Sequence, residues 1–357
     1  MSKQTGAYVR WLTLPLLAGI ATLLWWQRYQ ESLPPESLEM LMQREQIPNA
    51  VIAVRTAKGT TRLRVINRLA APSEDQATTS TQWPIASLSK PITASVVRHL
   101  IAQGALSLDT PAITWLPELA KTPDPRYAHI TIRHLLQHTS GLDQSRGDPM
   151  FRADVPIGCA GAIAVSLKHK LRAPPGSRMQ YSNTGYCMLG EIIARITGES
   201  YETATRRVLG VKRPGTLLLG PDAASAQQGK DLSANFARSL GAAGGWFSSA
   251  ATLATLYALD ARDASIPTLT TAPHGDWYYG LGWRVWPKGQ TYRLTHFGDL
   301  PGMFAAAVAY PDGSSAVVLM DGRAKDAETF ATAVYYFLEL ELTPAQNEPS
   351  HAGKPSQ

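Results

Sequence analysis

Trp83-Pro84-Ile85-Ala86-Ser87-Leu88-Ser89-Lys90 stands where a β-rich start of the chain gives way to a predicted helix over residues 91–101. If Ser87 opens that helix, Lys90 lies one turn later on the same face, with its amine near the Ser87 hydroxyl. A serine is a weak nucleophile unless a nearby base takes its proton, and a lysine kept neutral by burial can be that base. Ser89 is adjacent to Lys90 and faces elsewhere. A lone Ser-x-x-Lys also occurs in solvated helices, so other segments must support the pair.

Strand patterns lie on both sides of a long helical stretch. Two strands are predicted before it, at 51–55 and 61–66, and four after it, at 281–286, 292–296, 304–310 and 315–320. A last helix is predicted over 327–342. The first and last strands share a sheet only if the helical stretch is inserted between them. We therefore expect a discontinuous α/β part, about 36–108 and 273–342, an all-helical part over about 109–272, and a ligand cleft between them.

The N-terminus has the pattern of a membrane segment. Lys3 and Arg10 precede an apolar run over residues 11–26, which is long enough to cross a thin hydrocarbon core. Residues 27–31 offer no small-x-small cleavage site, which favours an uncleaved signal anchor over a cleaved secretory signal. Residues 1–30 are thus predicted as a cytoplasmic stub and single-pass inner-membrane anchor, followed by a linker at 31–35. The catalytic part would be periplasmic or extracellular, and the tail at 343–357 disordered. Secretion after cleavage is the alternative.

Charge and metal-ligand patterns exclude several classes of function. A net charge of +6 over 357 residues, without a basic cluster, argues against a nucleic-acid partner. His134 and His138 are one helical turn apart but lack a third ligand, so neither a metal nor another cofactor is expected. Residues 241–246 are glycine-rich without a phosphate-loop ending and are expected to form a loop close to the site. Cys159 and Cys187 either pair outside the cytoplasm or stay as small buried side chains, and we slightly favour the second.

Two further short segments carry polar groups suited to catalysis. Tyr181-Ser182-Asn183 precedes a predicted helix, and His296-Phe297-Gly298 lies at the end of the predicted strand 292–296. A phenol can relay a proton, and an amide can hold a carbonyl oxygen or an ammonium group. An imidazole at a strand end can contact such a relay, and glycine allows the backbone to approach a ligand. Taken alone, the first segment also fits a helix-capping turn and the second a surface histidine.

The order of these segments resembles the serine β-lactamase and penicillin-binding-protein superfamily, most closely the class C β-lactamase-like esterases and D-aminopeptidases. The matching segments are WPIASLSK (83–90), ITIRHLLQHTSGL (130–142), PGSRMQYSN (175–183), AGGWFSS (243–249), YGLGW (279–283) and HFG (296–298). The resemblance covers residues 36–342. It implies an α+β fold, an α/β sandwich in which an antiparallel sheet is flanked by helices and carries an inserted helical subdomain.

The resemblance also implies a serine hydrolase with named catalytic residues. Ser87 would be the acylated nucleophile, and Lys90 and Tyr181 would share general-base and general-acid duties. His296 would be the fourth catalytic residue, and Asn183, Gly298 and Asp299 would bind the substrate. The substrate would be an ester or amide, either a small molecule or derived from the cell envelope. A penicillin-binding D-Ala-D-Ala carboxypeptidase, an acyltransferase, and a β-lactam sensor or scaffold remain as alternatives. Sequence does not separate transfer from hydrolysis, because both share the acyl-enzyme.

One departure from the family's pattern bears on the substrate. His296 takes the place of the lysine in the family's Lys-Thr-Gly strand, and Phe297 has no hydroxyl. The oxyanion hole would be formed by the backbone N–H groups of Ser87 and of Asp299, which follows Gly298. A buried substrate carboxylate without a cation is costly, so we expect poor β-lactamase activity, unless an arginine such as Arg323 replaces the lysine.

Overall fold

The computed structural model describes residues 37–68, 76–142, 147–151, 158–210, 217–219, 234–269 and 275–343. The predicted anchor, the linker and nearly all of the predicted tail lie outside these residues. Within the described residues, no helix is both long enough and apolar enough to cross a membrane. The described residues from Leu38 onward form one compact unit, and the division at about 108 and 273 stays a prediction.

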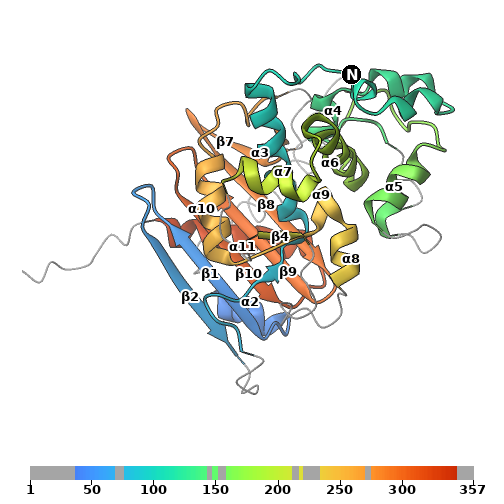
Figure 1. The fold of residues 1–357 in the computed structure, drawn as a ribbon. Coiled ribbons are helices and arrows are strands. Elements are labelled where there is room, and N and C mark those ends of the chain that lie inside the picture. Colours follow the sequence, from blue (N-terminus) through green and yellow to red (C-terminus); the bar gives the residue numbers. More distant parts are fainter. Residues whose placement is uncertain are drawn as a thin grey trace, which may run out of the picture. The chain divides into compact units, whose positions relative to one another are not determined.

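An antiparallel sheet joins strands from the two ends of the described chain (Figure 1). Seven of the described strands form it, in the order β2-β1-β10-β9-β8-β7-β6. Their bounds are β1 Asn49–Arg55, β2 Thr61–Asn67, β6 Tyr278–Tyr279, β7 Arg284–Lys288, β8 Thr291–Leu300, β9 Met303–Ala309 and β10 Ser315–Asp321. β1 pairs with β10 from Asn49 opposite Asp321 to Arg55 opposite Ser315. The predicted sharing of one sheet by the first and last strands is therefore confirmed.

Helices bury both faces of this sheet. α2 (Leu38–Arg44) and α11 (Ala327–Leu342) pack on one face, where Ile52 and Val54 meet Phe330 and Val334. On the other face, which α10 (Ala250–Asp260) covers, Val51 belongs to the larger hydrophobic core. Burial on both faces explains why β1, β9 and β10 are nearly continuous apolar runs rather than alternating ones.

The inserted part is mainly helical, as predicted, but includes a small sheet. The 3-10 helix Ala86–Leu88 and α3 Ser89–Ala102 precede the inserted part. Its helices are α4 Ile132–Leu136, α5 Cys159–Ser166, α6 Asn183–Thr197, α7 Tyr201–Val208, α8 Ala234–Ser239, α9 Gly241–Gly244 and α10, with 3-10 helices at Ala112–Thr114, Pro117–Lys121, Pro125–His129 and Pro149–Phe151. The second sheet has the order β3 (Trp83–Pro84), β5 (Trp246–Ser248), β4 (Leu217–Leu219). An all-helical insert was thus not quite correct, because strands of two or three residues are too short to show alternation.

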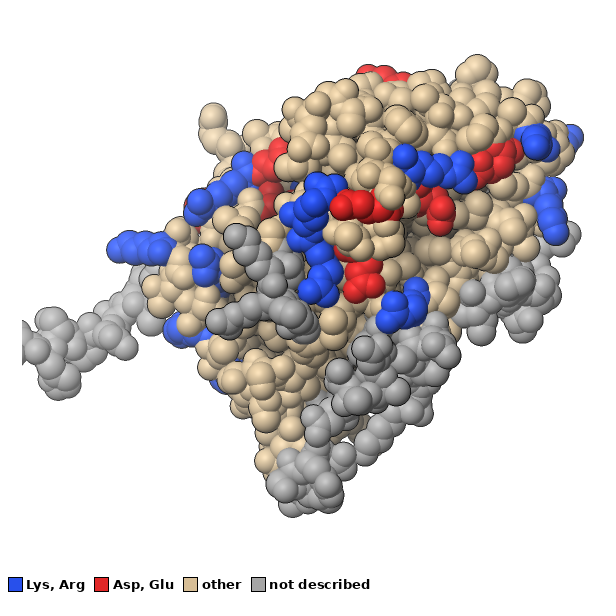
Figure 2. Space-filling view, viewed as in Figure 1, with Lys and Arg blue, Asp and Glu red and all other residues tan. Residues whose placement is uncertain are grey.

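Basic and acidic side chains are intermixed on the face of the molecule shown in Figure 2. Many surface charges in the described residues are paired, among them Arg195 with Glu118 at 2.7 Å and Arg207 with Glu199 at 2.8 Å. Mixed charges of this kind produce only a weak long-range field.

A disulfide bond joins two helices of the inserted part. Cys159 at the start of α5 is bonded to Cys187 in α6, with the Cα atoms 5.1 Å apart. The expectation of two unlinked side chains was wrong. The spacing of the two cysteines in the sequence gives no signal for pairing. In the structure, the packing of α5 against α6 brings them together. Cys187 lies one turn after Asn183, so the bond secures the helix that carries a predicted site residue.

Removing this disulfide should destabilise the fold. The bond closes a loop with a sequence separation of 28, so its loss should cost about 3–4 kcal/mol of unfolding free energy through the greater entropy of the unfolded chain. We expect dithiothreitol to lower the Tm by about 5–10 °C. The control is a chain with both cysteines changed to serine, which should start at the lower Tm and not respond to reductant. An equal response of both proteins would contradict this assignment.

Candidate active site

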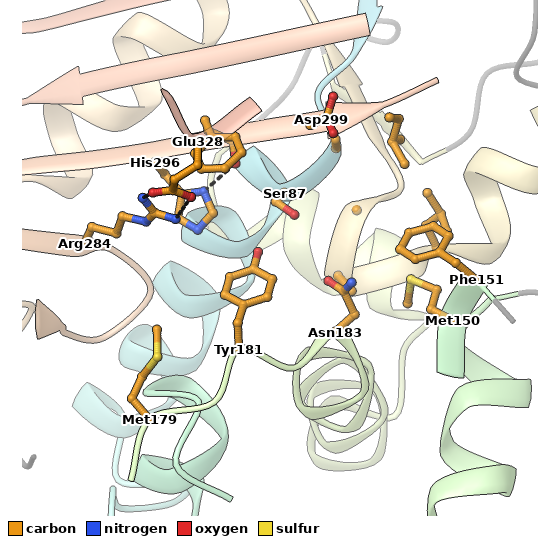
Figure 3. Close-up of a pocket in the computed structure, with 16 residues that line it drawn as sticks. Ser87, Met150, Phe151, Met179, Tyr181, Asn183, Arg284, His296, Asp299 and Glu328 are labelled. Atoms are coloured by element: carbon orange, nitrogen blue, oxygen red, sulfur yellow. Dashed lines mark hydrogen bonds and ion pairs between the residues drawn. The ribbon is translucent and has the colours of Figure 1, made fainter. Parts of the chain in front are cut away.

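Ser87 lines a cavity of about 350 Å³, and Figure 3 shows it among the other lining side chains. It sits in the 3-10 helix Ala86–Leu88, which runs directly into α3, so the predicted helix begins slightly before the predicted start. Ala86 has a φ of 45°, a left-handed conformation that is unusual for a residue with a Cβ. Strained backbone of this kind is retained where the surrounding structure needs a particular orientation, here that of the adjacent Ser87.

Lys90 is fully buried beneath Ser87 and contacts three oxygen atoms. Its Nζ lies 3.0 Å from Ser87 Oγ, 2.6 Å from Asn183 Oδ1 and 2.8 Å from the Ala243 carbonyl oxygen. The predicted contact between Ser87 and Lys90 is therefore confirmed. Burial lowers the pKa of Lys90 to about 7, against the opposing effect of the Asp148 carboxylate. A neutral amine has two N–H donors and one lone pair. With the two N–H groups donated to Asn183 and Ala243, the lone pair faces the Ser87 hydroxyl.

Tyr181 approaches the same hydroxyl from the other side. Its phenol forms a side-chain hydrogen bond with Ser87, and burial raises its pKa far above the ordinary value, so the phenol is protonated at neutral pH. The Lys90 Nζ lies 4.8 Å from the centroid of the Tyr181 ring. The two groups therefore differ in role at pH 7: Lys90 is able to accept a proton, and Tyr181 is able to donate one.

Asn183 links Lys90 to a carboxylate that sequence reasoning missed. It is the first residue of α6, and its Nδ2 donates to Asp148 Oδ2 at 2.5 Å while its Oδ1 accepts from Lys90. The Asp148 carboxylate can only accept a hydrogen bond, and the Lys90 amine donates one to the amide oxygen, so these two partners fix the orientation of the amide. Asp148 belongs to no motif, and a single aspartate before Pro149 gives no signal in the sequence.

We expect Asp148→Asn to shift the pH dependence of catalysis to lower pH. The Asp148 carboxylate raises the pKa of Lys90, so its removal should lower that pKa and keep the amine neutral in more acidic solution. The acidic limb of the kcat/KM profile should move to lower pH, with a plateau reduced by about tenfold because Asn183 is held less firmly. The control is Asp109→Asn, which removes a surface carboxylate paired with Arg133. An unmoved limb in the Asp148 variant would contradict this role.

His296 lies within a strand rather than at its end. β8 continues to Leu300, so the predicted strand end at residue 296 was wrong; Gly298 and Asp299 have the composition of a turn but pair with β9. Burial, with Lys90 and Arg284 nearby, holds the pKa of His296 well below its usual value. Its Nδ1 donates to the Phe297 carbonyl at 2.8 Å, because a carbonyl can only accept. Its Nε2 consequently accepts from the Tyr279 hydroxyl at 2.8 Å. Both ring nitrogens are thus engaged within the protein.

Gly298 allows β8 to run directly against the predicted nucleophile. A Cβ at this position would lie 2.3 Å from the Ile85 carbonyl oxygen and 2.9 Å from the Ser87 backbone nitrogen, which no side chain could tolerate. The next residue, Asp299, lines the cavity, and its carboxylate lies 2.9 Å from Arg323. Arg323 was considered as a partner for a substrate carboxylate, but it is engaged with Asp299.

The rest of the cavity has an apolar side and a charged side. The larger apolar side chains are Met150, Phe151, Met179, Leu240, Phe297 and Leu300. Among the described lining residues the cationic side chain is Arg284, which donates from Nη2 to Glu328 at 2.9 Å. Figure 3 shows this pair beside His296. Arg284 and Glu328 are far apart in the sequence, so no local motif could have revealed them.

Ser89 and the glycine-rich segment 241–246 take no part in the proposed chemistry but help to build the site. Ser89 is buried, and its Oγ accepts from the Trp246 backbone N–H at 3.3 Å. It therefore faces away from the cavity, as predicted. The segment 241–246 forms the short helix α9 and the start of β5 rather than the expected loop. It does lie close to the site, since Ala243 and Gly244 line the cavity.

The two histidines that were weighed as a metal pair serve different contacts. His134 Nδ1 accepts from the Thr131 N–H at 3.2 Å and completes the capping box of α4. His138 Nδ1 accepts from the Ser182 N–H at 3.0 Å. In the described part of the chain, no group of three histidine, cysteine, aspartate or glutamate side chains is placed to hold a metal ion.

In this site a buried lysine contacts a serine at the start of a helix. A tyrosine and an asparagine lie close to the same pair, and a β-strand runs alongside. This arrangement is the one expected above for β-lactamase-like serine hydrolases. The Beta-lactamase family model matches residues 36–338. The chain belongs to this family, and the predicted relationship to β-lactamase-like hydrolases is confirmed.

Individual relatives match a smaller part of the chain. FimD of serogroup H1 from Dichelobacter nodosus, a protein named for fimbrial assembly, is 36% identical over 142 residues, which cover 40% of this chain and 36% of FimD. Esterase EstB of Burkholderia gladioli is 35% identical over 136 residues, which cover 35% of this chain and 34% of the esterase. The chain spans about a third of the length of these curated relatives.

Solved structures confirm the predicted fold over most of the chain. The D-amino acid amidase of Ochrobactrum anthropi SV3 superposes with a TM-score of 0.66 at 22% identity, covering 84% of this chain and 97% of the amidase. The class C β-lactamase of Rhodobacter sphaeroides gives a TM-score of 0.65 at 19% identity, covering 85% of this chain and 98% of the enzyme. Identities this low establish the shared fold.

Proposed function

We propose that this protein is a serine hydrolase that forms an acyl-enzyme on Ser87. The observation that carries the proposal is the contact between Ser87 Oγ and the fully buried Lys90, whose pKa is lowered to about 7. A base with a pKa near the working pH combines a large neutral fraction with useful proton affinity. The buried, protonated phenol of Tyr181 supplies the matching acid.

The proposed acylation uses these groups in turn. Neutral Lys90 takes the proton of Ser87 as Oγ bonds to the substrate carbonyl carbon, giving a tetrahedral oxyanion. The backbone N–H groups of Ser87 and Asp299 would stabilise this oxyanion. As the bond from carbon to the leaving group breaks, Tyr181 protonates the departing oxygen or nitrogen and regains a proton from the Lys90 ammonium. Water then attacks the carbonyl carbon of the acyl-enzyme ester and gives up a proton to the same pair. The bond from that carbon to Ser87 Oγ breaks, the pair returns a proton to Oγ, and the carboxylic acid leaves.

The cavity supports esters or amides that have an apolar acyl part and carry no free carboxylate. Arg284 is already paired with Glu328, and Arg323 with Asp299. A substrate carboxylate would therefore have to displace an internal ion pair or remain without a cationic partner, and both are costly. This disfavours the alternatives of β-lactamase and D-Ala-D-Ala carboxypeptidase. Acyl transfer would share the first step and differ only in the second nucleophile.

Mass spectrometry of the whole chain tests the acyl-enzyme. The purified protein is mixed with 4-nitrophenyl butyrate, quenched in acid within seconds, and measured intact and after digestion. We expect a butyryl adduct on the peptide that contains Ser87 and a steady release of nitrophenol. A long-lived adduct without turnover would favour the sensor alternative. An adduct on another peptide would refute the assignment of Ser87.

A matched pair of esters tests the substrate class. 4-Nitrophenyl hexanoate and the 4-nitrophenyl monoester of adipic acid have acyl chains of the same length, but the second ends in a carboxylate. We expect kcat/KM to be about tenfold to a hundredfold lower for the charged ester, because its carboxylate finds no free cation. Equal rates, or a preference for the charged ester, would contradict the proposed substrate class.

We also propose that the catalytic part works outside the cytoplasm, on a membrane anchor formed by residues 11–26. The disulfide supports this location, because such bonds persist mainly in oxidising compartments. The full chain should remain with membranes after carbonate washing, and protease added to spheroplasts should digest its catalytic part. Protection from protease would refute this orientation. Release as a shortened soluble protein would favour the secreted alternative.

A further inference from the structure

Tyr181 lies in a segment without helix or strand, just before α6. No regular ladder of backbone hydrogen bonds therefore fixes its position. Its proposed role nevertheless requires the phenol to meet the Ser87 hydroxyl within hydrogen-bond distance. Some other part of the molecule must hold this stretch of chain in place, since a displacement of about 1 Å can cost on the order of a hundredfold in rate.

His138 holds the backbone on both sides of Tyr181. Its carbonyl oxygen accepts from the Gln180 N–H at 2.7 Å, and its Nδ1 accepts from the Ser182 N–H at 3.0 Å. The imidazole ring also packs on the phenol, with ring centroids 4.2 Å apart and planes inclined by 35°. One residue thus contacts the neighbours of Tyr181 and its side chain.

His138 is retained in spite of two local costs. Its φ of 58° places a residue other than glycine in the left-handed region. Because Nδ1 accepts a hydrogen bond, the neutral ring carries its proton on Nε2, and this buried N–H has no hydrogen-bond partner among the residues that the structure describes. The ring instead lies among aromatic neighbours, with Tyr279 edge-on at 4.4 Å and Tyr186 at 5.1 Å. A residue kept under such strain is a candidate for a functional role.

The His138 ring is also neutral, as its hydrogen bond with the Ser182 N–H requires. Burial, together with the positive charges of Lys90 and Arg284 and the neighbouring His296, holds the pKa of His138 well below its usual value. A neutral ring keeps Nδ1 free to accept from Ser182, whereas a protonated ring would have to donate at both nitrogens. The hydrogen bond to Ser182 therefore persists across the pH range in which Lys90 titrates.

We propose that His138 is a positioning residue for Tyr181: by holding residues 180 and 182 and packing on the phenol, it directs the Tyr181 hydroxyl toward Ser87. The proposal rests on the proposed role of Tyr181 in acylation. It assigns a task to the histidine that sequence reasoning considered only as half of a metal pair. His138 acts through Tyr181 and does not touch the reacting atoms.

The test compares two amides in place of the imidazole. In His138→Asn the side-chain oxygen occupies the position of Nδ1, so it can still accept from Ser182, and asparagine tolerates the left-handed backbone. In His138→Gln the oxygen is one bond farther out, and the contact is lost. In the full-length chain we expect the rate of butyryl adduct formation to fall about a hundredfold in the glutamine variant and only about tenfold in the asparagine variant. Thermal melts of both establish that they fold.

A double variant distinguishes a positioning role for His138 from a general loss of structure at the site. If His138 acts through Tyr181, then His138→Gln should have little further effect in a chain that already carries Tyr181→Phe, because the phenol it directs has been removed. Equal losses in the two backgrounds would overturn the proposal, as would a folded His138→Gln protein that acylates at the unaltered rate. Failure of the unaltered protein to acylate at Ser87 would refute the proposed function, a result that is distinguishable from either of these.

Discussion

A chain carrying Ser87→Ala should form no butyryl adduct and should lose ester turnover by at least about 10⁴-fold. The loss is large because the oxygen that bonds to the substrate is removed. Ser89, the adjacent serine, is buried with its Oγ on the Trp246 N–H, away from the cavity. Intact-mass spectrometry measures adduct formation, and stopped-flow absorbance of the released nitrophenol measures ester turnover.

Ser89→Ala is the matched control for this experiment. It removes a hydroxyl two residues away and leaves the Trp246 N–H without its acceptor, so a loss of about 1 kcal/mol in unfolding free energy is expected. Its rate of adduct formation should remain within about threefold of the unaltered chain. If Ser87→Ala retained the adduct and Ser89→Ala lost it, the two serines would have to exchange roles.

Replacing Lys90 by methionine should reduce acylation by about 10³-fold or more. Methionine fills a similar volume but has no lone pair that can take the Ser87 proton at neutral pH. The rise in kcat/KM with pH near 7, expected from the lowered pKa of Lys90, should disappear from whatever activity remains. Steady-state kinetics between about pH 5 and pH 9 measure both effects.

Lys90→Arg separates charge from basicity. Arginine keeps a positive charge beside Ser87 and Asn183 but does not give up its proton in this pH range. It should therefore be as inactive as the methionine variant. An arginine variant that kept acylation within about tenfold would show that Lys90 acts through its charge alone, and the assignment of the general base would have to be withdrawn.

Long, regular features of the fold could be predicted from the sequence, and features built by distant contacts could not. The last helix was predicted over 327–342 and is observed at Ala327–Leu342, because its apolar residues recur at helical spacing for four turns. The four C-terminal strands were also found at nearly the right places. The strands of the second sheet have two or three residues each and leave no period to detect.

The candidate site divides in the same way. The contact of Ser87 with Lys90 follows from helical spacing, so the sequence was sufficient for it. Asp148 and the pair formed by Arg284 and Glu328 reach the site only through tertiary structure, and their neighbours in sequence carry no signal. His296 shows a third case: the residue was identified, but its two hydrogen bonds, and with them its protonation, depend on Tyr279 and on a strand longer than predicted.

The pairing of β1 with β10 has a consequence for how the protein is made. Asn49 and Asp321 are neighbours in the sheet but are 272 residues apart in the chain. A ribosome synthesises β1 and β2 early, and this hairpin must wait, with apolar residues exposed on both faces, until β9 and β10 emerge. The central sheet therefore cannot close during synthesis, and contacts between such distant residues form slowly. Interrupted synthesis would leave a long-lived, aggregation-prone fragment that depends on chaperones.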